Sequence, residues 1–395
     1  MKILIANLGS TSFKYQLLDM NGERQLARGS IDRIGFPESR CRVEIGGARV
    51  ETVLSMPDHA HAVHQCLAQL SDPEYGCLKN GDQISAIGFK AVVGGRVGGV
   101  QRVTPEVLEA MQEAAAIAPA HNPAYISAMR MLRQKMPHIP LVAAFETDFH
   151  CTIPDHNRYY AVPLEWADKF LVRRWGYHGA SHRYIATRSA ELLGRSDLRT
   201  ISCHLGGSNS LCAIRGGQSV ANSFGFSAQT GLPHANRVGD FDPFALPLLM
   251  KATGKSLEEV LAVLSGKSGL AGLSGTSGDF RDLMAAVDQG SARARLALDV
   301  FAASVRHYLG AYLVELGGAD LIVFTGGIGE NEHRFRAIVL RDLEGLGIVL
   351  DPSVNERTRG EAPIHAPDSR VQIWVMPTNE ELIVARLAKR LLEGY

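Results

Sequence analysis

A short segment near the start of the chain combines side chains that could bind phosphate and a metal ion. Residues 7–14 (NLGSTSFK) bring an amide, three hydroxyls and a lysine to the bend of a predicted hairpin. Ammonium and hydroxyl groups bind phosphate oxygens, and amide oxygens suit hydrated Mg²⁺. A solvated turn with a surface lysine has the same composition, so the segment by itself leaves both interpretations open.

A second candidate is a glycine-rich segment towards the end of the chain. Residues 320–325 (DLIVFT) form a predicted buried strand, and residues 326–331 (GGIGEN) follow it at once, ahead of a helical segment. Glycines in such a loop let backbone N–H groups approach a nucleotide or a phosphate closely. A tight turn from strand to helix would need the same glycines.

Two other segments resemble the end of a phosphate-binding P-loop. Residues 254–256 and 266–268 (both GKS) supply the last part of that motif, but Leu249 and Leu261 stand where its first glycine belongs. The sequence therefore predicts that this is not a P-loop kinase.

Further charged and histidine side chains lie on short or glycine-rich segments, at residues 121–123 (HNP), 145–148 (FETD), 177–179 (YHG), 236–240 (NRVGD) and 279–281 (DFR). Any one of these histidines would more often be a packing residue, and any one Arg–Asp pair would more often be a surface ion pair. Together they supply what phosphoryl transfer requires. Cations neutralise the transferring group, an acidic group holds a metal ion or orients the nucleophile, and backbone amides hold the nucleotide.

The predicted strands and helices that position these segments form an α/β pattern, and its opening strand–turn–strand unit occurs twice. Strands are predicted at residues 3–5, 13–18, 41–45, 86–93 and 140–145, and helices after Asp58 and Thr104. Residues 200–207 (TISCHLGG) repeat residues 3–10 (ILIANLGS), since each is a strand that ends in Leu-Gly and leads into a second strand. The repeat favours two similar domains, although Leu-Gly after a strand also recurs by chance.

Length and composition narrow the class of protein. The 395 residues exceed one ordinary core, and equal totals of 41 Lys plus Arg and 41 Asp plus Glu give a nucleic-acid role little support. The N-terminal apolar run is too short for a signal peptide, and we expect no membrane span. The six cysteines form no CxxC pair, so we expect a reduced, cytoplasmic protein.

The order of these motifs resembles the acetate kinase family, which comprises acetate, propionate and butyrate kinases. The resemblance runs over essentially the whole chain, through ILIANLGSTSFKYQLL, APAHNPA, RRWGYHGASHRY, CHLGG, RVGDFDP, SGDFRDL, FTGGIGEN and MPTNEELIVAR. It implies an α/β fold of two duplicated actin-like (ribonuclease H-like) domains around a nucleotide cleft. The expected domains are residues 1–149 with a returning C-terminal helix at 381–395, and residues 150–380. A homodimer is also implied.

The resemblance further implies a role for individual residues. Asn7 and Glu380 would hold Mg²⁺, and Lys90, His121, Glu146, His178 and Arg237 would be catalytic. The nucleotide would be bound by Ser12, Lys14, His204, Leu205, Gly206, Gly207, Ser208, Asp279, Phe280, Arg281, Gly327, Ile328, Gly329, Glu330 and Asn331. The acid would be bound by Lys90, Val92, Ala120, Tyr177 and Ala228.

Three positions depart from the family pattern within the chemistry. Lys90 replaces an arginine and loses its bidentate fork, while Glu146 replaces the catalytic aspartate and is one methylene longer. In the nucleotide loop, Gly207 replaces an asparagine, and the nearest amide side chain is Asn209. Because the first two changes keep the charge, we interpret them as retuning of an active kinase rather than loss of activity.

The acid pocket also departs from the family pattern. Ala120 and Ala228 stand where the family has leucine and proline, and Tyr177 adds a hydroxyl. Removed volume admits a larger substrate, and a polar donor can select a polar one. The sequence thus predicts an acid that is larger or more polar than acetate, unless neighbouring side chains refill the space.

The predicted reaction is the Mg²⁺-dependent transfer of a phosphoryl group from ATP to a small carboxylic acid, giving an acyl phosphate and ADP. One alternative is a kinase for a sugar or alcohol hydroxyl, in which Glu146 would act as a base. The other is a nucleotide-binding homologue that has no catalytic activity.

Overall fold

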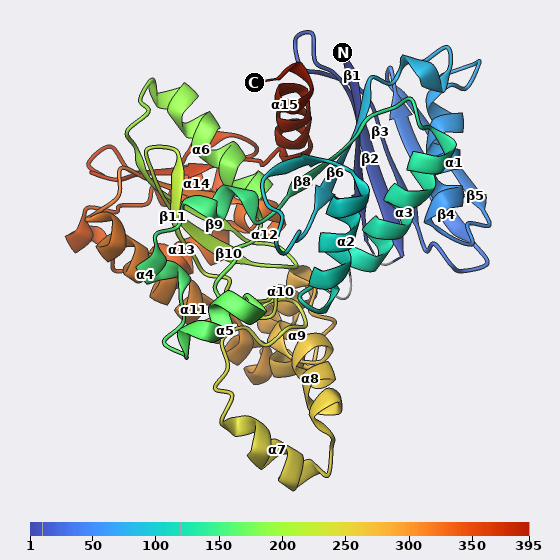
Figure 1. Cartoon of the computed structure of the whole chain (residues 1–395). Coiled ribbons are helices and arrows are strands. Elements are labelled where there is room, and N and C mark those ends of the chain that lie inside the picture. Colours follow the sequence, from blue (N-terminus) through green and yellow to red (C-terminus); the bar gives the residue numbers. More distant parts are fainter. Residues whose placement is uncertain (10, 119–120, 395) are drawn as a thin grey trace. The chain divides into compact units, whose positions relative to one another are not determined.

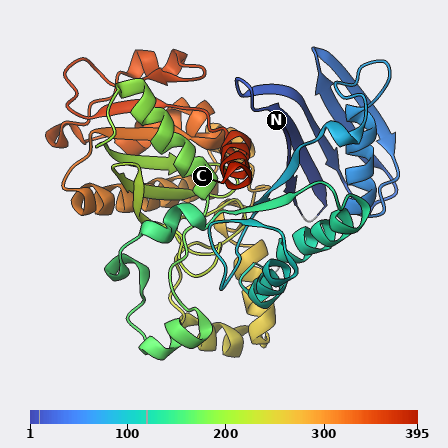
Figure 2. The ribbon, with the colours of Figure 1, turned by 45° about the horizontal axis from the view of Figure 1, so that its top comes forward.

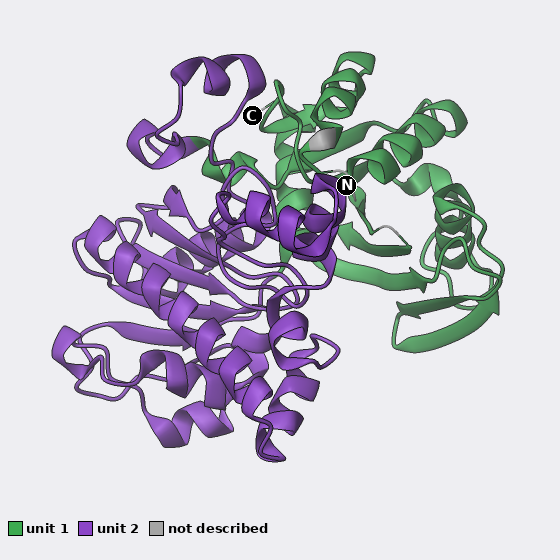
Figure 3. Cartoon of the chain, turned by 90° about the horizontal axis from the view of Figure 1, so that it is seen from below, with its two compact units in different colours: residues 1–151, 379–395 green, residues 152–378 purple. Residues whose placement is uncertain are grey.

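The computed structural model describes residues 1–9, 11–118 and 121–394, and these form two compact units. The first unit contains Met1–Cys151 and Asn379–Tyr395, and the second contains Thr152–Thr378 (Figure 3). The chain therefore passes between the units at residues 151/152 and 378/379, where the sequence predicts 149/150 and 380/381.

The first unit is built on a mixed sheet with the strand order β5-β4-β3-β2-β1-β6-β8-β7. Its strands are β1 (Lys2–Leu8), β2 (Ser12–Asp19), β3 (Arg24–Asp32), β4 (Ser39–Ile45), β5 (Ala48–Leu54), β6 (Ala86–Ala91), β7 (Val100–Arg102) and β8 (Leu141–Phe145). Strands β1, β6 and β8 are parallel neighbours, whereas β1 to β5 form an antiparallel meander. The carboxyl ends of the three parallel strands therefore meet at one edge.

Helices cover both faces of this sheet, but not over its full width. They are α1 (His59–Leu70), η1 (Gly81–Gln83), α2 (Pro105–Glu113), η2 (Ala114–Ala116), α3 (Asn122–Lys135), η3 (Asp148–Thr152) and α15 (Glu380–Glu393). Helices α1, α2 and α3 pack on one face, and α15 packs on the other face against β1, β6 and β8 (Figure 1). The chain's last helix thus completes its first unit.

Local chemistry explains where the first helices begin. The Asp58 side chain accepts a hydrogen bond from the His61 N–H (2.9 Å), and the Thr104 hydroxyl accepts one from the Val107 N–H (3.3 Å). Each cap satisfies a backbone donor that has no partner within its helix. Both helix starts agree with the sequence prediction.

The second unit has a sheet with the order β11-β10-β9-β12-β14-β13. Its strands are β9 (Arg199–His204), β10 (Ser210–Arg215), β11 (Gln218–Asn222), β12 (Leu321–Thr325), β13 (Ala362–Pro363) and β14 (Gln372–Val375). Its helices are α4 (Asp155–Arg158), α5 (Leu164–Phe170), α6 (Gly179–Leu193), α7 (Ala245–Thr253), α8 (Leu257–Gly266), α9 (Gly269–Ser274), α10 (Phe280–Asp288), α11 (Ala292–Leu316), α12 (Gly326–Asn331), α13 (His333–Leu340), η4 (Glu344–Leu346) and α14 (Pro352–Arg357).

The central strand of this second sheet is buried on both faces. Leu321 and Val323 of β12 pack in the cluster that contains Ile185 of α6, whereas Ile322 and Phe324 pack with α11. Helices cover this sheet on both faces (Figure 2). Successive side chains of a strand point to opposite faces, so an uninterrupted apolar run is what a doubly covered strand requires.

The two sheets share one topology. In the first, β3-β2-β1-β6-β8 runs antiparallel, antiparallel, parallel, parallel, and β11-β10-β9-β12-β14 does the same in the second. The strand–turn–strand repeat predicted from residues 3–10 and 200–207 therefore belongs to a duplicated fold.

Two predicted boundaries were wrong. The glycine-rich residues 326–331 are not a loop before a helix but themselves the short helix α12, and β6 ends at Ala91 rather than Val93. Gly326 has a φ of +76°, and a Cβ there would lie 2.7 Å from the Leu205 carbonyl oxygen, so only glycine fits. Among the helices of the described residues, not one combines the length and apolarity needed to cross a membrane.

Candidate active site

The carboxyl ends of the parallel strands in the first unit gather three of the predicted site residues. Asn7 lies near the end of β1, Lys90 near the end of β6, and Glu146 directly after β8. Neighbouring parallel strands end together, and ligands of open α/β sheets bind beyond this edge. The Glu146 N–H also donates to the Ala91 carbonyl oxygen (2.8 Å), which fixes the chain at this turn.

Lys90 lies between two carboxylates. Its ammonium forms a hydrogen-bonded ion pair with Glu380, the first residue of α15, and lies 3.8 Å from Glu146 Oε1. All three side chains are largely buried, with 19%, 13% and 7% exposed for Lys90, Glu380 and Glu146. Burial by itself would lower the pKa of the Lys90 ammonium, but the charges of Glu380 and Glu146 raise it above its usual range. The cluster carries one net negative charge.

Tyr125 supports the Asn7 side of this cluster. Its hydroxyl accepts a hydrogen bond from the Leu8 N–H (3.1 Å) and donates to Asn7 Oδ1 (3.4 Å). Burial raises the pKa of Tyr125 to about 12, so the phenol stays protonated and remains a donor.

The donor chemistry of this edge fits a divalent metal ion. Asn7 and Glu380 supply hard oxygen donors, and the cluster's net charge is negative. In the described part of the chain, no group of three or more His, Cys, Asp or Glu side chains could hold a metal by itself. Mg²⁺ commonly uses only one or two protein oxygens and completes its shell with water and substrate phosphates, so this small donor set suits it.

A backbone hydrogen bond links the end of β1 to the start of β2. The Gly9 N–H donates to the Ser12 carbonyl oxygen (2.8 Å), and a Cβ on Gly9 would lie 2.5 Å from Ser12 Oγ. Lys14 pairs with Asn7 in the β1–β2 ladder and is exposed. Ser10 lies outside the described residues.

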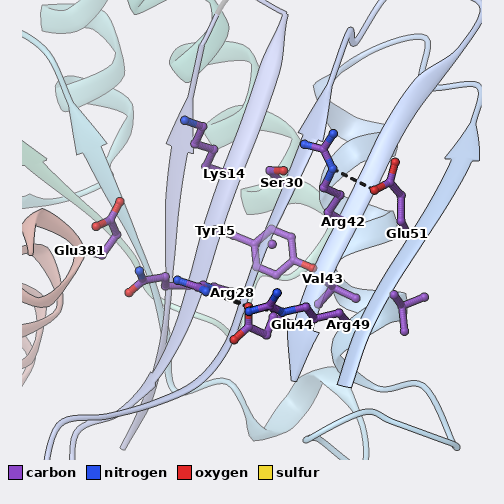
Figure 4. Close-up of a pocket in the computed structure, with 13 residues that line it drawn as sticks. Lys14, Tyr15, Arg28, Ser30, Arg42, Val43, Glu44, Arg49, Glu51 and Glu381 are labelled. Atoms are coloured by element: carbon purple, nitrogen blue, oxygen red, sulfur yellow. Dashed lines mark hydrogen bonds and ion pairs between the residues drawn. The ribbon is translucent and has the colours of Figure 1, made fainter. Parts of the chain in front are cut away.

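Lys14 lines a hollow of about 700 Å³ on the open face of β2 to β5 (Figure 4). The other residues that line it are Tyr15, Gln16, Arg28, Gly29, Ser30, Arg42, Val43, Glu44, Arg49, Val50, Glu51 and Glu381. The arginines are already paired, Arg28 with Glu44 (2.8 Å) and Arg42 with Glu51 (3.1 Å). The hollow is therefore the polar face of an antiparallel sheet. Lys14 is the predicted site residue among those that line it.

Two further predicted residues of this unit lie near α3. His121 is the exposed residue that precedes α3, and Val92 is half-buried after β6. Asn122, the neighbour of His121, is fully buried and donates to the carbonyl oxygens of Val93 (3.0 Å) and Met111 (2.9 Å), so its role is structural. Ala120 lies outside the described residues.

In the second unit, His178 has an unusual backbone and a serine partner. It caps α6 with a left-handed conformation (φ 57°, ψ 33°), which is uncommon for a residue other than glycine. Its Nδ1 lies 2.9 Å from Ser210 Oγ, and its ring contacts that of His204 (centroids 4.2 Å apart). Strained backbone of this kind is typical of functional positions.

Arg237 lies on the same segment as Ala228, between β11 and α7, and Tyr177 is hydrogen-bonded to this segment. The Arg237 guanidinium donates to the Ala228 carbonyl oxygen, and burial lowers its pKa to about 10, which leaves it charged at neutral pH. Tyr177 is buried, and its hydroxyl donates to the Phe226 carbonyl oxygen (3.0 Å). Since a phenol has one proton, this hydroxyl does not offer a donor to a bound acid.

The two predicted nucleotide segments lie against each other. The Ile328 N–H donates to the Leu205 carbonyl oxygen (2.9 Å), and a Cβ on Gly206 would lie 3.8 Å from the Gly327 nitrogen. Gly207 is exposed and Ser208 half-buried, and Asn331 Nδ2 donates to the Gly327 carbonyl oxygen (2.9 Å). The glycines thus leave backbone open to a ligand on one side.

Several side chains of the predicted nucleotide set are structural in this unit. Leu205, Ile328 and Phe280 are buried in its core, and the Glu330 carboxylate accepts from the Gly326 N–H (2.9 Å) at the start of its own helix. Any contact of the three apolar residues with a nucleotide would use their backbone. Gly329 lies buried within α12.

The segment 279–281 begins α10. Asp279 caps the helix by accepting from the Arg281 N–H (2.9 Å), and its carboxylate also pairs with the Arg281 guanidinium (2.6 Å). The Arg281 side chain is 89% exposed, so it can turn to a ligand at the loss of a weak surface pair.

Three buried residues support these segments. Sequence reasoning named Asn209 only as the nearest amide of the nucleotide loop and did not name the other two. Asn209 holds the loop at residues 206–208, because its side chain accepts from the Gly206 N–H (2.8 Å) and donates to the Pro233 carbonyl oxygen (2.7 Å). Arg336 is 1% exposed and donates to the carbonyl oxygens of Gly329 (2.8 Å) and Glu330 (3.0 Å). The third is Ser210, described with His178 above. The polar type of these residues was visible in the sequence, but their burial was not.

Comparison with known proteins agrees with this geometry. Residues 2–386 match the family model described as the acetokinase family. The chain is 42% identical over 393 residues to the acetate kinase of Anoxybacillus flavithermus, covering 99% of this chain and 98% of that protein. It is 41% identical over 393 residues to the acetate kinase of Bacillus subtilis, covering 99% of each.

Solved structures show the same likeness. The acetate kinase of Porphyromonas gingivalis superposes with a TM-score of 0.92 at 38% identity, covering 99% of both chains. A propionate kinase of Francisella tularensis gives a TM-score of 0.92 at 30% identity, covering 98% of both.

The duplicated sheet topology and these structural relatives define a phosphotransferase of the actin-like fold. The chain belongs to the acetokinase family. Membership makes it an enzyme that transfers a phosphoryl group to a carboxyl group, which is the class that the sequence predicted.

Proposed function

We propose that this enzyme uses Mg²⁺ and ATP to phosphorylate a small carboxylic acid larger than acetate. The observation that carries the catalytic part is the buried Lys90 ammonium held between Glu146 and Glu380 at the ends of the parallel strands. A fixed cation beside carboxylates and an amide oxygen is the equipment that positions an anionic substrate and a metal-bound phosphate.

In the proposed reaction a carboxylate oxygen of the acid attacks the γ-phosphorus of ATP. The new P–O bond forms as the bond to the β-phosphate oxygen breaks, and ADP leaves. The acid is already ionised at neutral pH, so no general base is needed. Catalysis then consists of orientation and charge neutralisation.

Each set of residues has a part in this proposal. Lys90 binds the acid's carboxylate and a phosphoryl oxygen, and Glu146 and Glu380 keep its ammonium in place. Arg237 and His178 donate to the transferring phosphoryl group, and the segments 204–208, 279–281 and 327–331 hold the nucleotide, with Ser12 and Lys14 at its phosphates. Asn7 and Glu380 would hold Mg²⁺, which supplies positive charge to the phosphate oxygens when bound.

The small Ala228 side chain supports a larger acid. It stands in the loop that Arg237 contacts, and alanine leaves room for extra methylenes of the substrate. The hydroxyl of Tyr177 lends no support to a polar acid, because it donates to Phe226. We therefore propose an acid that is larger than acetate, and we make no proposal that it is more polar.

The test is an ADP-release assay with hydroxylamine trapping over acids from formate to branched acids. Acyl phosphates give hydroxamates, whereas phosphate esters do not. A higher kcat/KM for an acid longer than acetate is expected. If acetate is best, the size preference is wrong while the kinase stands. ADP release only with alcohols would favour the hydroxyl kinase, and ATP binding without any turnover would favour the non-catalytic homologue.

We also propose a homodimer. Apolar side chains of the segment around α7 are exposed, among them Phe244 (87%) and Leu248 (68%), and α7 buries no residue within its own chain. Apolar patches of this kind are typical of surfaces that bind another protein. Sedimentation equilibrium should give twice the chain mass, and Leu248→Glu should give a monomer. A cytoplasmic location is supported by the buried cysteines Cys41, Cys66, Cys203 and Cys212, which are free thiols.

A further inference from the structure

A line of buried side chains lies behind His178. Ser210 Oγ is 2.9 Å from His178 Nδ1 and 2.8 Å from His182 Nε2, and His182 Nδ1 is 2.9 Å from Ser202 Oγ. Ser202, His182 and Ser210 are each 0% exposed. Four polar groups thus form one continuous hydrogen-bonded line from the core to His178.

The backbone ties the same residues together. The His182 N–H donates to the His178 carbonyl oxygen (2.9 Å) in the first turn of α6, where His178 has its left-handed conformation. Ser210 begins β10, and Ser202 lies on the neighbouring strand β9. The two histidines therefore come from α6 and its N-cap, and both serines come from the sheet on which that helix packs.

The single proton of the Ser210 hydroxyl restricts this line to two arrangements when both histidines are neutral. Ser210 donates to one imidazole nitrogen, and the other nitrogen must carry hydrogen to donate to Ser210. In the first arrangement His182 Nε2–H donates to Ser210, and Ser210 donates to His178 Nδ1, so the His178 proton is on Nε2. In the second arrangement every bond is reversed, and His178 Nε2 carries no proton.

We infer that Ser210 and His182 are positioning residues that hold His178 as its Nε2–H tautomer. The inference rests on the proposed function, because phosphoryl oxygens are acceptors and require a donor from His178. Since Nδ1 is bound to Ser210, a substrate must use Nε2. The line supplies the donating tautomer before the substrate arrives, so no tautomer exchange is needed during the reaction.

The direct test is long-range proton–nitrogen NMR of the chain labelled with ¹⁵N-histidine, with the His178 signals assigned by comparison with His178→Gln. Nitrogen shifts distinguish the two tautomers without requiring activity. The expected result is a neutral His178 with its proton on Nε2, and likewise for His182. A His178 proton on Nδ1 would overturn the inference, whatever the activity of the chain.

Variants test the line a second way. Ser210→Ala removes the link without adding volume, and it should convert His178 to a mixture of tautomers. We expect kcat to fall about tenfold or more, with both KM values within about threefold, because an oriented donor is lost and not a binding contact. Ser189→Ala is the matched control, since Ser189 is buried on the same helix and its hydroxyl has no partner among the described residues. It should leave the tautomers and kcat unchanged.

His182→Gln and His182→Asn form a discriminating pair. The glutamine amide can reach the place of Nε2 and donate to Ser210, whereas the asparagine amide takes the place of Nδ1 and cannot. His182→Gln should keep the His178 tautomer and most of kcat, and His182→Asn should behave like Ser210→Ala. Equal loss in both would show a packing role and refute the inference. If the unaltered chain phosphorylates no acid, the proposed function fails, while the NMR result still decides the tautomer.

Discussion

Removal of the Lys90 ammonium should destabilise the chain and not only inactivate it. In Lys90→Met, Glu146 and Glu380 would remain next to each other with 7% and 13% of their side chains exposed and no cation between them. Breaking a buried ion pair by removing one partner costs about 3–5 kcal/mol. We expect a loss of about 3 kcal/mol in the free energy of unfolding, since Lys90 itself retains 19% exposure.

The pH dependence of this loss follows from the direction of the pKa shift. The carboxylates raise the Lys90 pKa in the folded chain, so its stabilisation is complete below the unfolded pKa of about 10.4 and disappears only as the pH rises through the higher folded value. The difference between wild type and Lys90→Met should therefore be constant from pH 7 to pH 9.

Urea unfolding followed by circular dichroism measures both effects. Lys14→Met is the matched control, because Lys14 is exposed on the same sheet, and its free energy of unfolding should match that of wild type. The double variant Lys90→Met/Glu146→Gln should recover part of the loss, since one of the two unneutralised charges is removed. Equal unfolding energies for Lys90→Met and wild type would refute the buried ion pair.

Three further predictions concern the second unit. Arg237→Ala should lower kcat by about 100-fold or more while ATP affinity is kept, as measured by coupled ADP release and nucleotide titration; unchanged turnover would exclude Arg237 from the reaction. Arg336→Met should lower the free energy of unfolding by about 3 kcal/mol and raise the KM for ATP, because two carbonyl groups of α12 lose their hydrogen-bond donor. An unchanged KM would show that Arg336 does not support the nucleotide site. Burial lowers the pKa of His234 to about 3. The His234 imidazole is therefore protonated near pH 6.5 in the unfolded chain but stays neutral in the folded chain. The free energy of unfolding should fall as the pH drops from about 6.5 towards 3. His234→Asn keeps an acceptor for the Asn209 N–H and should flatten this dependence in urea unfolding at pH 7 and pH 5; an equally steep loss would assign it to other groups.

Local sequence was sufficient for the features that short-range physics controls. The cap residues Asp58 and Thr104 start helices because their side chains satisfy nearby N–H groups, and the apolar run of β12 requires burial on both faces. The strand repeat was visible because each copy is a strand that ends in Leu-Gly and leads into a second strand. The family motifs then predicted the enzyme class, the duplicated fold and the candidate site residues.

The tertiary structure decided what surrounds those residues. Lys90 and Glu380 are 290 positions apart, and only the return of α15 to the first sheet brings the second carboxylate to the ammonium. The glycine-rich residues 326–329 (GGIG) were predicted as a loop, but the Leu205 carbonyl and the buried Arg336 guanidinium hold them in a helix. The Tyr177 hydroxyl was assigned to the substrate and instead donates to Phe226. A sequence shows which side chains are polar. A buried polar group, however, binds the partner that the fold brings within hydrogen-bond distance. Contacts between residues far apart in the chain determine which partner that is.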